Sequence, residues 1–222
     1  MQGKLGIITG GAKGTYFQFG LNLKELGKKF GYNIQVYNSR GSVENVYAVY
    51  KRPKTEMGIV QSDVLAFVLK VQSNKVLKSI ARKTKMVFPL YNEEVHLLGK
   101  TEVASFDDLE NRRVAVDKEG SGTYPWQSQS VSTVAVKAVL VSFDFRGSNC
   151  DSVGEFANIV YDNLEWLKQN GHPKWKSVDL DYPLKGWDQY DCVKKHRRGG
   201  NPTETGQPME ENPLLDAIKE ML

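Results

Sequence analysis

The sequence has little net charge and no long apolar run, and these two absences narrow the classes of protein to consider. Lys and Arg number 30 against 26 Asp and Glu, which leaves a net charge of +4. The basic residues are scattered among acidic ones rather than gathered on one face, so we expect no nucleic-acid partner. A run of about 18 apolar residues, which a membrane-spanning helix needs, does not occur. Because the first four residues lead directly into an apolar strand, we expect no export signal in this chain.

Cysteine and histidine are also scarce. The two cysteines, Cys150 and Cys192, lie far apart in the sequence, and the three histidines have no metal-ligand spacing. On this evidence alone the cysteines could form one disulfide or remain two buried thiols. The sequence offers no serine nucleophile turn, no pair of catalytic carboxylates and no Cys–His nucleophile. We therefore expect a protein that binds without catalysing, and that holds no metal or cofactor.

The first seventy residues contain three strand-and-helix units. Apolar runs predict strands over residues 5–9, around Ile34 and Val36, and over residues 57–60. Apolar residues at helical spacing predict the first helix, and a glycine is expected to end it: Phe19, Leu23, Leu26, Phe30 and Gly31. The second helix is predicted by Val43, Val46 and Tyr50, and the third covers residues 64–71. This alternation predicts an α/β domain with a mainly parallel sheet.

The rest of the chain repeats these elements less regularly. Strands are predicted over residues 86–90, 95–98, 114–116 and 134–141. One amphipathic helix is predicted over residues 151–170, and a last short helix begins at residue 212. The basic run over residues 194–198 is interpreted as a solvated tail.

Small-residue turns follow the predicted strands. They read TGGAKGTY at residues 9–16, SRGS at 39–42, QSD at 61–63 and EGSGT at 119–123. In parallel sheets the carboxyl ends of the strands meet at one edge, where ligands bind. The amide groups that begin a helix have no partner within the helix and carry partial positive charge, so converging turns of this kind suit a small carboxylate. Taken singly, Ser42, Ser62 and Ser121 are equally typical of helix N-caps.

A dinucleotide site is the alternative. The first turn is close to the TGxxxGxG pattern of short-chain dehydrogenases, and Arg40 stands where such enzymes hold a 2′-phosphate. Tyr47 with Lys51 and Tyr190 with Lys194 even have the spacing of a catalytic Tyr-xxx-Lys pair. However, Tyr16 stands in place of the last glycine, and its ring would fill the space that a pyrophosphate needs. An NADP-dependent reductase therefore remains the second hypothesis.

In this order, the motifs resemble a family of transport receptors. They are TGG at 9–11, GTY at 14–16, GSVEN at 41–45, GIVQSD at 58–63, FDDL at 106–109, RVAV at 113–116, GSGT at 120–123 and TVAVKAVLV at 133–141. Together they resemble the TAXI family of solute-binding receptors for tripartite ATP-independent periplasmic (TRAP) transporters. The resemblance covers most of the chain.

The resemblance implies a type II periplasmic-binding-protein-like α/β fold, with two lobes joined by hinge strands. It implies capture of a small organic acid or amino acid, glutamate-like or a dicarboxylate, which is passed to the permease subunits of a secondary TRAP transporter. Carried onto this sequence, the ligand contacts would be Gly14, Thr15, Tyr16, Ser42, Asn45, Gln61, Asp63, Ser121 and Thr123. Hydroxyl and amide donors would hold the carboxylate, and Asp63 would hold an ammonium group or order its turn.

The resemblance also predicts a short second lobe. Lobe 1 would comprise residues 1–95 and 136–222, and residues 96–135 would form an abbreviated lobe 2, truncated between Thr123 and Tyr124. A receptor of this family acts in the periplasm or another extracytoplasmic compartment. Because that compartment is oxidising, the resemblance favours a disulfide between Cys150 and Cys192.

Overall fold

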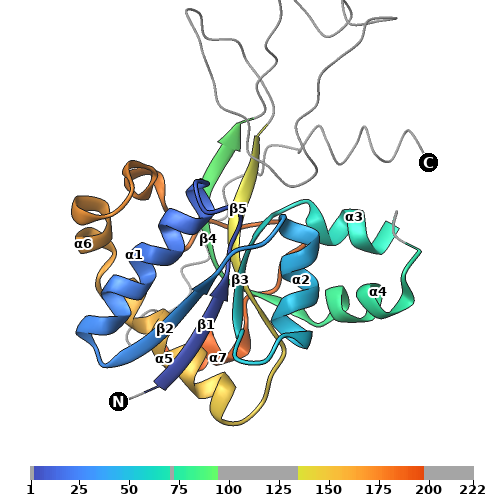
Figure 1. Ribbon diagram of the computed structural model, residues 1–222, viewed down its shortest axis with the longest axis horizontal. Coiled ribbons are helices and arrows are strands. Elements are labelled where there is room, and N and C mark those ends of the chain that lie inside the picture. Colours follow the sequence, from blue (N-terminus) through green and yellow to red (C-terminus); the bar gives the residue numbers. More distant parts are fainter. Residues whose placement is uncertain (1–2, 71–72, 95–134, 198–222) are drawn as a thin grey trace, which may run out of the picture.

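A five-stranded sheet forms the centre of the computed structural model, which describes residues 3–70, 73–94 and 135–197 (Figure 1). The strand order is β2-β1-β3-β5-β4. The strands are β1 (Gly3–Ile8), β2 (Tyr32–Tyr37), β3 (Met57–Gln61), β4 (Thr84–Glu94) and β5 (Ala135–Phe143). The fold is therefore α/β, consistent with a periplasmic-binding-protein-like fold.

The sheet is mixed, whereas the sequence predicts a mainly parallel sheet; the difference lies in the direction of β5. β1 pairs in parallel with β2 and β3, but β5 runs antiparallel to both of its neighbours, β3 and β4. The strand at residues 134–141 was predicted, yet nothing in its apolar pattern specifies its direction. As a result, the carboxyl ends of β3 and β4 and the amino end of β5 lie at the same edge of the sheet.

Helices cover both faces of this sheet (Figure 1). One face packs against α1 (Thr15–Lys29), α5 (Ser148–Asp162), α6 (Leu164–Asn170), the 3-10 helix η2 (Pro173–Ser177) and α7 (Asp191–His196). The other packs against α2 (Ser42–Lys51), α3 (Val64–Lys70) and α4 (Lys75–Arg82). Two separate apolar cores result, one on each side of the sheet.

The helix α1 confirms most of its predicted apolar face. Phe19, Leu23 and Leu26 are fully buried in the first core, where Phe19 stacks on Trp175 with ring centroids 4.3 Å apart. The prediction for Phe30 was wrong, because this residue follows the last helical residue and its side chain is 39% exposed. Gly31, with φ of 81°, adopts the left-handed conformation that ends the helix.

Two further predictions need correction, and one helix was missed. The single helix expected over residues 151–170 is two helices, α5 and α6, which meet at Asn163; the side chain of Asn163 donates to the carbonyl oxygen of Ile159 at 2.8 Å. The strand expected at residues 86–90 is longer and continues to Glu94, whereas residues 95–98 lie outside the described chain. The helix α4 was not predicted, although Asn74 caps it by accepting from the amides of Val76 and Leu77.

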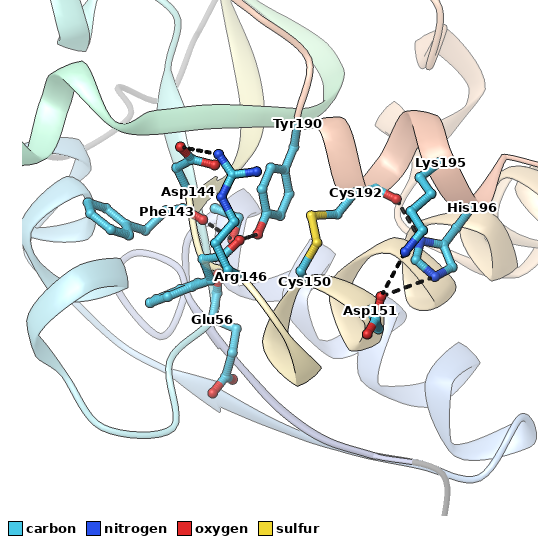
Figure 2. The surroundings of a disulfide bond; sticks show 12 residues. Glu56, Phe143, Asp144, Arg146, Cys150, Asp151, Tyr190, Cys192, Lys195 and His196 are labelled. Carbon is cyan, nitrogen blue, oxygen red and sulfur yellow. Dashed lines mark hydrogen bonds and ion pairs between the residues drawn. A yellow bond between two sulfur atoms is a disulfide. The ribbon is translucent and has the colours of Figure 1, made fainter.

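A disulfide joins the two cysteines at the end of the sheet away from the predicted ligand edge (Figure 2). Cys150 lies in the first turn of α5 and Cys192 in α7, with Cα atoms 5.4 Å apart. His196 reaches back to the carbonyl oxygen of Cys192 at 2.8 Å, and Asp151 lies 3.6 Å from the His196 ring. Part of the basic run expected to be a tail is therefore helical and attached to the domain.

Within the described ranges, none of the helices has the length and apolar character needed to cross a membrane.

Candidate ligand-binding site

The first predicted turn brings the start of α1 to the carboxyl end of β1. The amide of Gly14 donates to the carbonyl oxygen of Gly11 at 2.8 Å, which closes the glycine turn immediately before the helix. Thr15 and Tyr16 are the first two helical residues, and both are partly buried. Their amide groups belong to the first turn of α1, where the helix dipole is positive.

The second turn is fastened to the first. The hydroxyl of Ser39 donates to the carbonyl oxygen of Thr9 at 3.0 Å and accepts from the amide of Gly41 at 3.1 Å. Gly41 has φ of 145°, a region that favours glycine, and it is the residue that precedes α2. Ser42 is therefore not the N-cap of its helix.

Two serines of the turns connect neighbouring segments instead of capping helices. The hydroxyl oxygen of Ser42 accepts from the amide of Gln61 at 3.0 Å, which joins the second turn to the third. The hydroxyl oxygen of Ser62 accepts from the amide of Lys137 at 3.0 Å, and the Ser62 amide donates back to the Lys137 carbonyl at 2.8 Å. The three turns thus form one hydrogen-bonded edge that extends from β1 to β5.

Asn45 lies beneath this edge rather than on it. Its side chain is fully buried, and its amide nitrogen donates to the carbonyl oxygens of Thr9 and, at 2.6 Å, Ile59. These bonds tie the end of β1 to β3, so the geometry gives Asn45 a structural role. Its predicted contact with a ligand stays a prediction.

Glu93, near the end of β4, is the residue at this edge that sequence reasoning missed. The hydroxyl of Tyr16 donates to its Oε2 atom at 3.0 Å, and the hydroxyl of Tyr91 lies 3.4 Å from its Oε1 atom. The side chain of Gln61 also interacts with Glu93 and acts to lower its pKa, so α1, β3 and β4 converge on one carboxyl group. Glu93 is partly buried, and Tyr91 beneath it is almost completely buried.

The electrostatics of this cluster follow from its burial. Burial raises the pKa of the Glu93 carboxyl, and hydrogen bonds from Tyr16, Gln61 and Tyr91 with the charge of Lys174 oppose the shift only in part. Burial and the Glu93 charge raise the pKa of both tyrosine hydroxyls, Tyr16 and Tyr91, well above the ordinary value. Both phenols therefore stay protonated and act as donors at neutral pH.

Lys174, the cation near this carboxyl, pairs with a different group. Its ammonium lies 3.3 Å from the Oε2 atom of Glu94 and 3.2 Å from the carbonyl oxygen of Asn92. The helix η2 that carries it is anchored to α1, because Asn22 accepts from the Trp175 indole at 3.0 Å and from the His172 amide at 2.9 Å. Lys174 thus lies over the end of β4 while its direct partner is Glu94.

The structure brings together four of the predicted ligand contacts. The Gln61 amide donates to Ser42. Ser42 acts to lower the pKa of Tyr16, Thr15 that of Tyr91, and the Gln61 side chain that of Glu93, so these four residues interact with one cluster. Gly14 and Asp63 are exposed beside this group. Ser121 and Thr123, predicted from the opposing lobe, lie outside the described residues, as does all of predicted lobe 2 except Ala135.

The structure gives no support to the reductase hypothesis. Tyr190 is buried and donates to the carbonyl oxygen of Phe145 at 2.6 Å, near the disulfide at the opposite end of the sheet (Figure 2). Tyr47 projects to solvent from α2. The antiparallel strand β5 also departs from the parallel sheet of a dinucleotide-binding fold.

The described residues contain no group of three or more His, Cys, Asp or Glu that could hold a metal ion.

A comparison with known protein families supplies the remaining evidence. A model of the NMT1-like family matches residues 7–126, which is more than half of the chain and includes the three turns and Glu93. The chain therefore belongs to the NMT1-like family, a periplasmic solute-binding family related to the TAXI receptors of TRAP transporters.

Proposed function

We propose that this protein is the extracytoplasmic receptor of a TRAP transporter and captures a small carboxylate, glutamate-like or a dicarboxylate, for its permease. The observation that carries the proposal is the hydrogen-bonded edge that joins Tyr16, Ser42 and Gln61 at the carboxyl ends of the strands. Membership of a solute-binding family supports the same conclusion, because its members generally bind small molecules and deliver them to membrane transporters.

The residue types at this edge suit an acid. The first turn of α1 offers backbone amides with partial positive charge, and Thr15, Tyr16 and Ser42 add hydroxyl groups. Amides and hydroxyls can hold a carboxylate without an arginine when several of them converge. We further propose that Ser121 and Thr123 close the site from the second lobe.

Isothermal titration calorimetry with L-glutamate, 2-oxoglutarate, succinate and NADPH tests this function. We expect binding of at least one of the three acids and no binding of NADPH. Replacing Ser42 by Ala removes the acceptor of the Gln61 amide, and we expect affinity to fall at least about tenfold. Ser148→Ala, at the exposed start of α5, is the matched control and should bind normally. Binding of NADPH without binding of any acid would overturn the proposal.

A further inference from the structure

We propose that Glu93 binds an ammonium group of the captured solute, so that the site selects amino acids over the matching acids that lack the amino group. This inference rests on the proposed receptor function and specifies the class of solute. Neither the family match nor the motifs assign Glu93 a role.

The first argument is that the described residues include no direct counter-ion of Glu93. Among the ion pairs of the described residues, none includes Glu93, whereas the adjacent Glu94 pairs with Lys174 at 3.3 Å. Of the two neighbouring glutamates at the end of β4, Glu94 therefore has a direct cationic partner among the described residues and Glu93 has none. A partly buried carboxylate held only by neutral donors is costly, and a cationic group of a ligand would offset that cost.

The second argument is the hydrogen-bonding capacity that remains. An ionised carboxylate accepts at about four lone-pair positions, and the hydroxyls of Tyr16 and Tyr91 occupy two of them. An ammonium group has three donors and no acceptor, so it complements a site that already has its donors in place. The phenol hydroxyls fix the carboxylate before the ligand arrives, which reduces the cost of ordering it.

The third argument is the position of Glu93 relative to the acid-binding groups. Tyr16 contributes its hydroxyl to Glu93, while its own backbone amide belongs to the first turn of α1. Gln61 likewise connects Glu93 with Ser42. Glu93 and the start of α1 are therefore linked through one side chain, and we assign the carboxylate of an α-amino acid to the helix start and its ammonium to Glu93. The exposed Asp63 does not share these contacts, so Glu93 takes the ammonium role that the sequence suggested for Asp63.

The experiment compares pairs of acids that differ only in the amino group: L-glutamate with glutarate, L-aspartate with succinate, and L-norleucine with hexanoate. We expect the wild-type protein to bind the amino acid of the binding pair at least about tenfold more tightly. Glu93→Gln keeps an acceptor for the two phenols and removes the charge, and it should reduce this preference to below about threefold. Glu94→Gln, the matched control on the same strand, should retain the preference.

The outcomes separate this inference from the receptor function. If the plain acid binds as tightly as the amino acid, or if Glu93→Gln keeps the preference, the role of Glu93 is refuted and the receptor function stands. If neither 2-oxoglutarate nor any member of a pair binds, the receptor function fails and the inference with it. If a variant does not fold, the pH dependence of binding to the wild-type protein tests the same role. The preference for the amino acid over the matching acid should decline as pH falls and Glu93 is protonated. The titratable groups that face Glu93 are Tyr16 and Tyr91, whose raised pKa keeps them neutral over this range, and Lys174, whose ammonium pairs with Glu94.

Discussion

The hydroxyl of Tyr16 lies 3.0 Å from the carboxylate of Glu93, although the two residues are 77 positions apart in the sequence. The contact joins the start of the first helix to the end of β4, and it makes a partly buried acid part of the candidate site. Its energetic cost leads to the first prediction.

Glu93→Gln should stabilise the ligand-free protein at about pH 7. Because the pKa of Glu93 is raised on folding, the native state binds more protons than the unfolded state between the two pKa values, and stability falls as pH rises through that interval. Glutamine avoids this cost, so its advantage should be present at neutral pH and vanish below the ordinary carboxyl pKa of about 4. Thermal unfolding at several pH values checks this, and a variant less stable than wild type at neutral pH would contradict it.

Asn45→Ala should destabilise the protein by about 2–4 kcal/mol, because it removes the buried amide donor that the carbonyl oxygens of Thr9 and Ile59 share, and leaves Thr9 only its bond from the Ser39 hydroxyl. Urea unfolding measures the change. Asn170→Ala removes one exposed bond to the Trp166 carbonyl and should cost less than about 1 kcal/mol. Equal effects of the two substitutions would show that Asn45 does not tie the strands together.

Replacing Cys150 and Cys192 by Ser should lower the free energy of unfolding by about 3–4 kcal/mol in the chain-entropy model, given the separation of 42 residues. The same loss should appear in the wild-type protein when a reducing agent is added. Unfolding curves that coincide with and without reductant would mean that the bond adds no stability.

Gly6→Ala should destabilise the protein by about 1–3 kcal/mol, because a methyl group there would overlap the backbone carbonyl of Lys54. The same glycine donates its amide to Glu56 at 2.7 Å, so the segments cannot separate without losing that bond. Gly11→Ala is the control, since its added carbon would meet nothing within 4 Å. Comparable melting temperatures for both variants would argue against the close approach at Gly6.

The local elements of the first three units were predictable because apolar spacing reports burial directly. Leu23 and Leu26 repeat at helical spacing, and Ile34 alternates with polar neighbours in β2. The break at Asn163 was not predictable, because the apolar spacing of α5 continues into α6 across it. Phe30 extends the apolar pattern of α1 beyond the helix, since the left-handed Gly31 follows it at once.

The candidate site was predictable only where it consists of turns. The small residues around Ser42 and Gln61 are visible in the sequence, because turn chemistry is local. Glu93 is one glutamate among polar residues at the end of a strand, and its proximity to Tyr16 depends on the direction of β5 and on packing between distant segments. The serines gave a misleading local signal, because Ser42 bonds across the edge to Gln61 instead of capping its own helix.

The pairing of β4 with β5 has a consequence for how such proteins diversify. Glu94 and Ala135 are register partners on adjacent antiparallel strands, so the chain leaves the sheet and re-enters it at neighbouring positions (Figure 1). The two apolar cores are assembled from residues on either side of that gap. The two ends of the segment between Glu94 and Ala135 therefore lie side by side at one edge of the described sheet. We expect that the intervening segment can be exchanged for a longer one or a tight hairpin without rebuilding the three turns and Glu93.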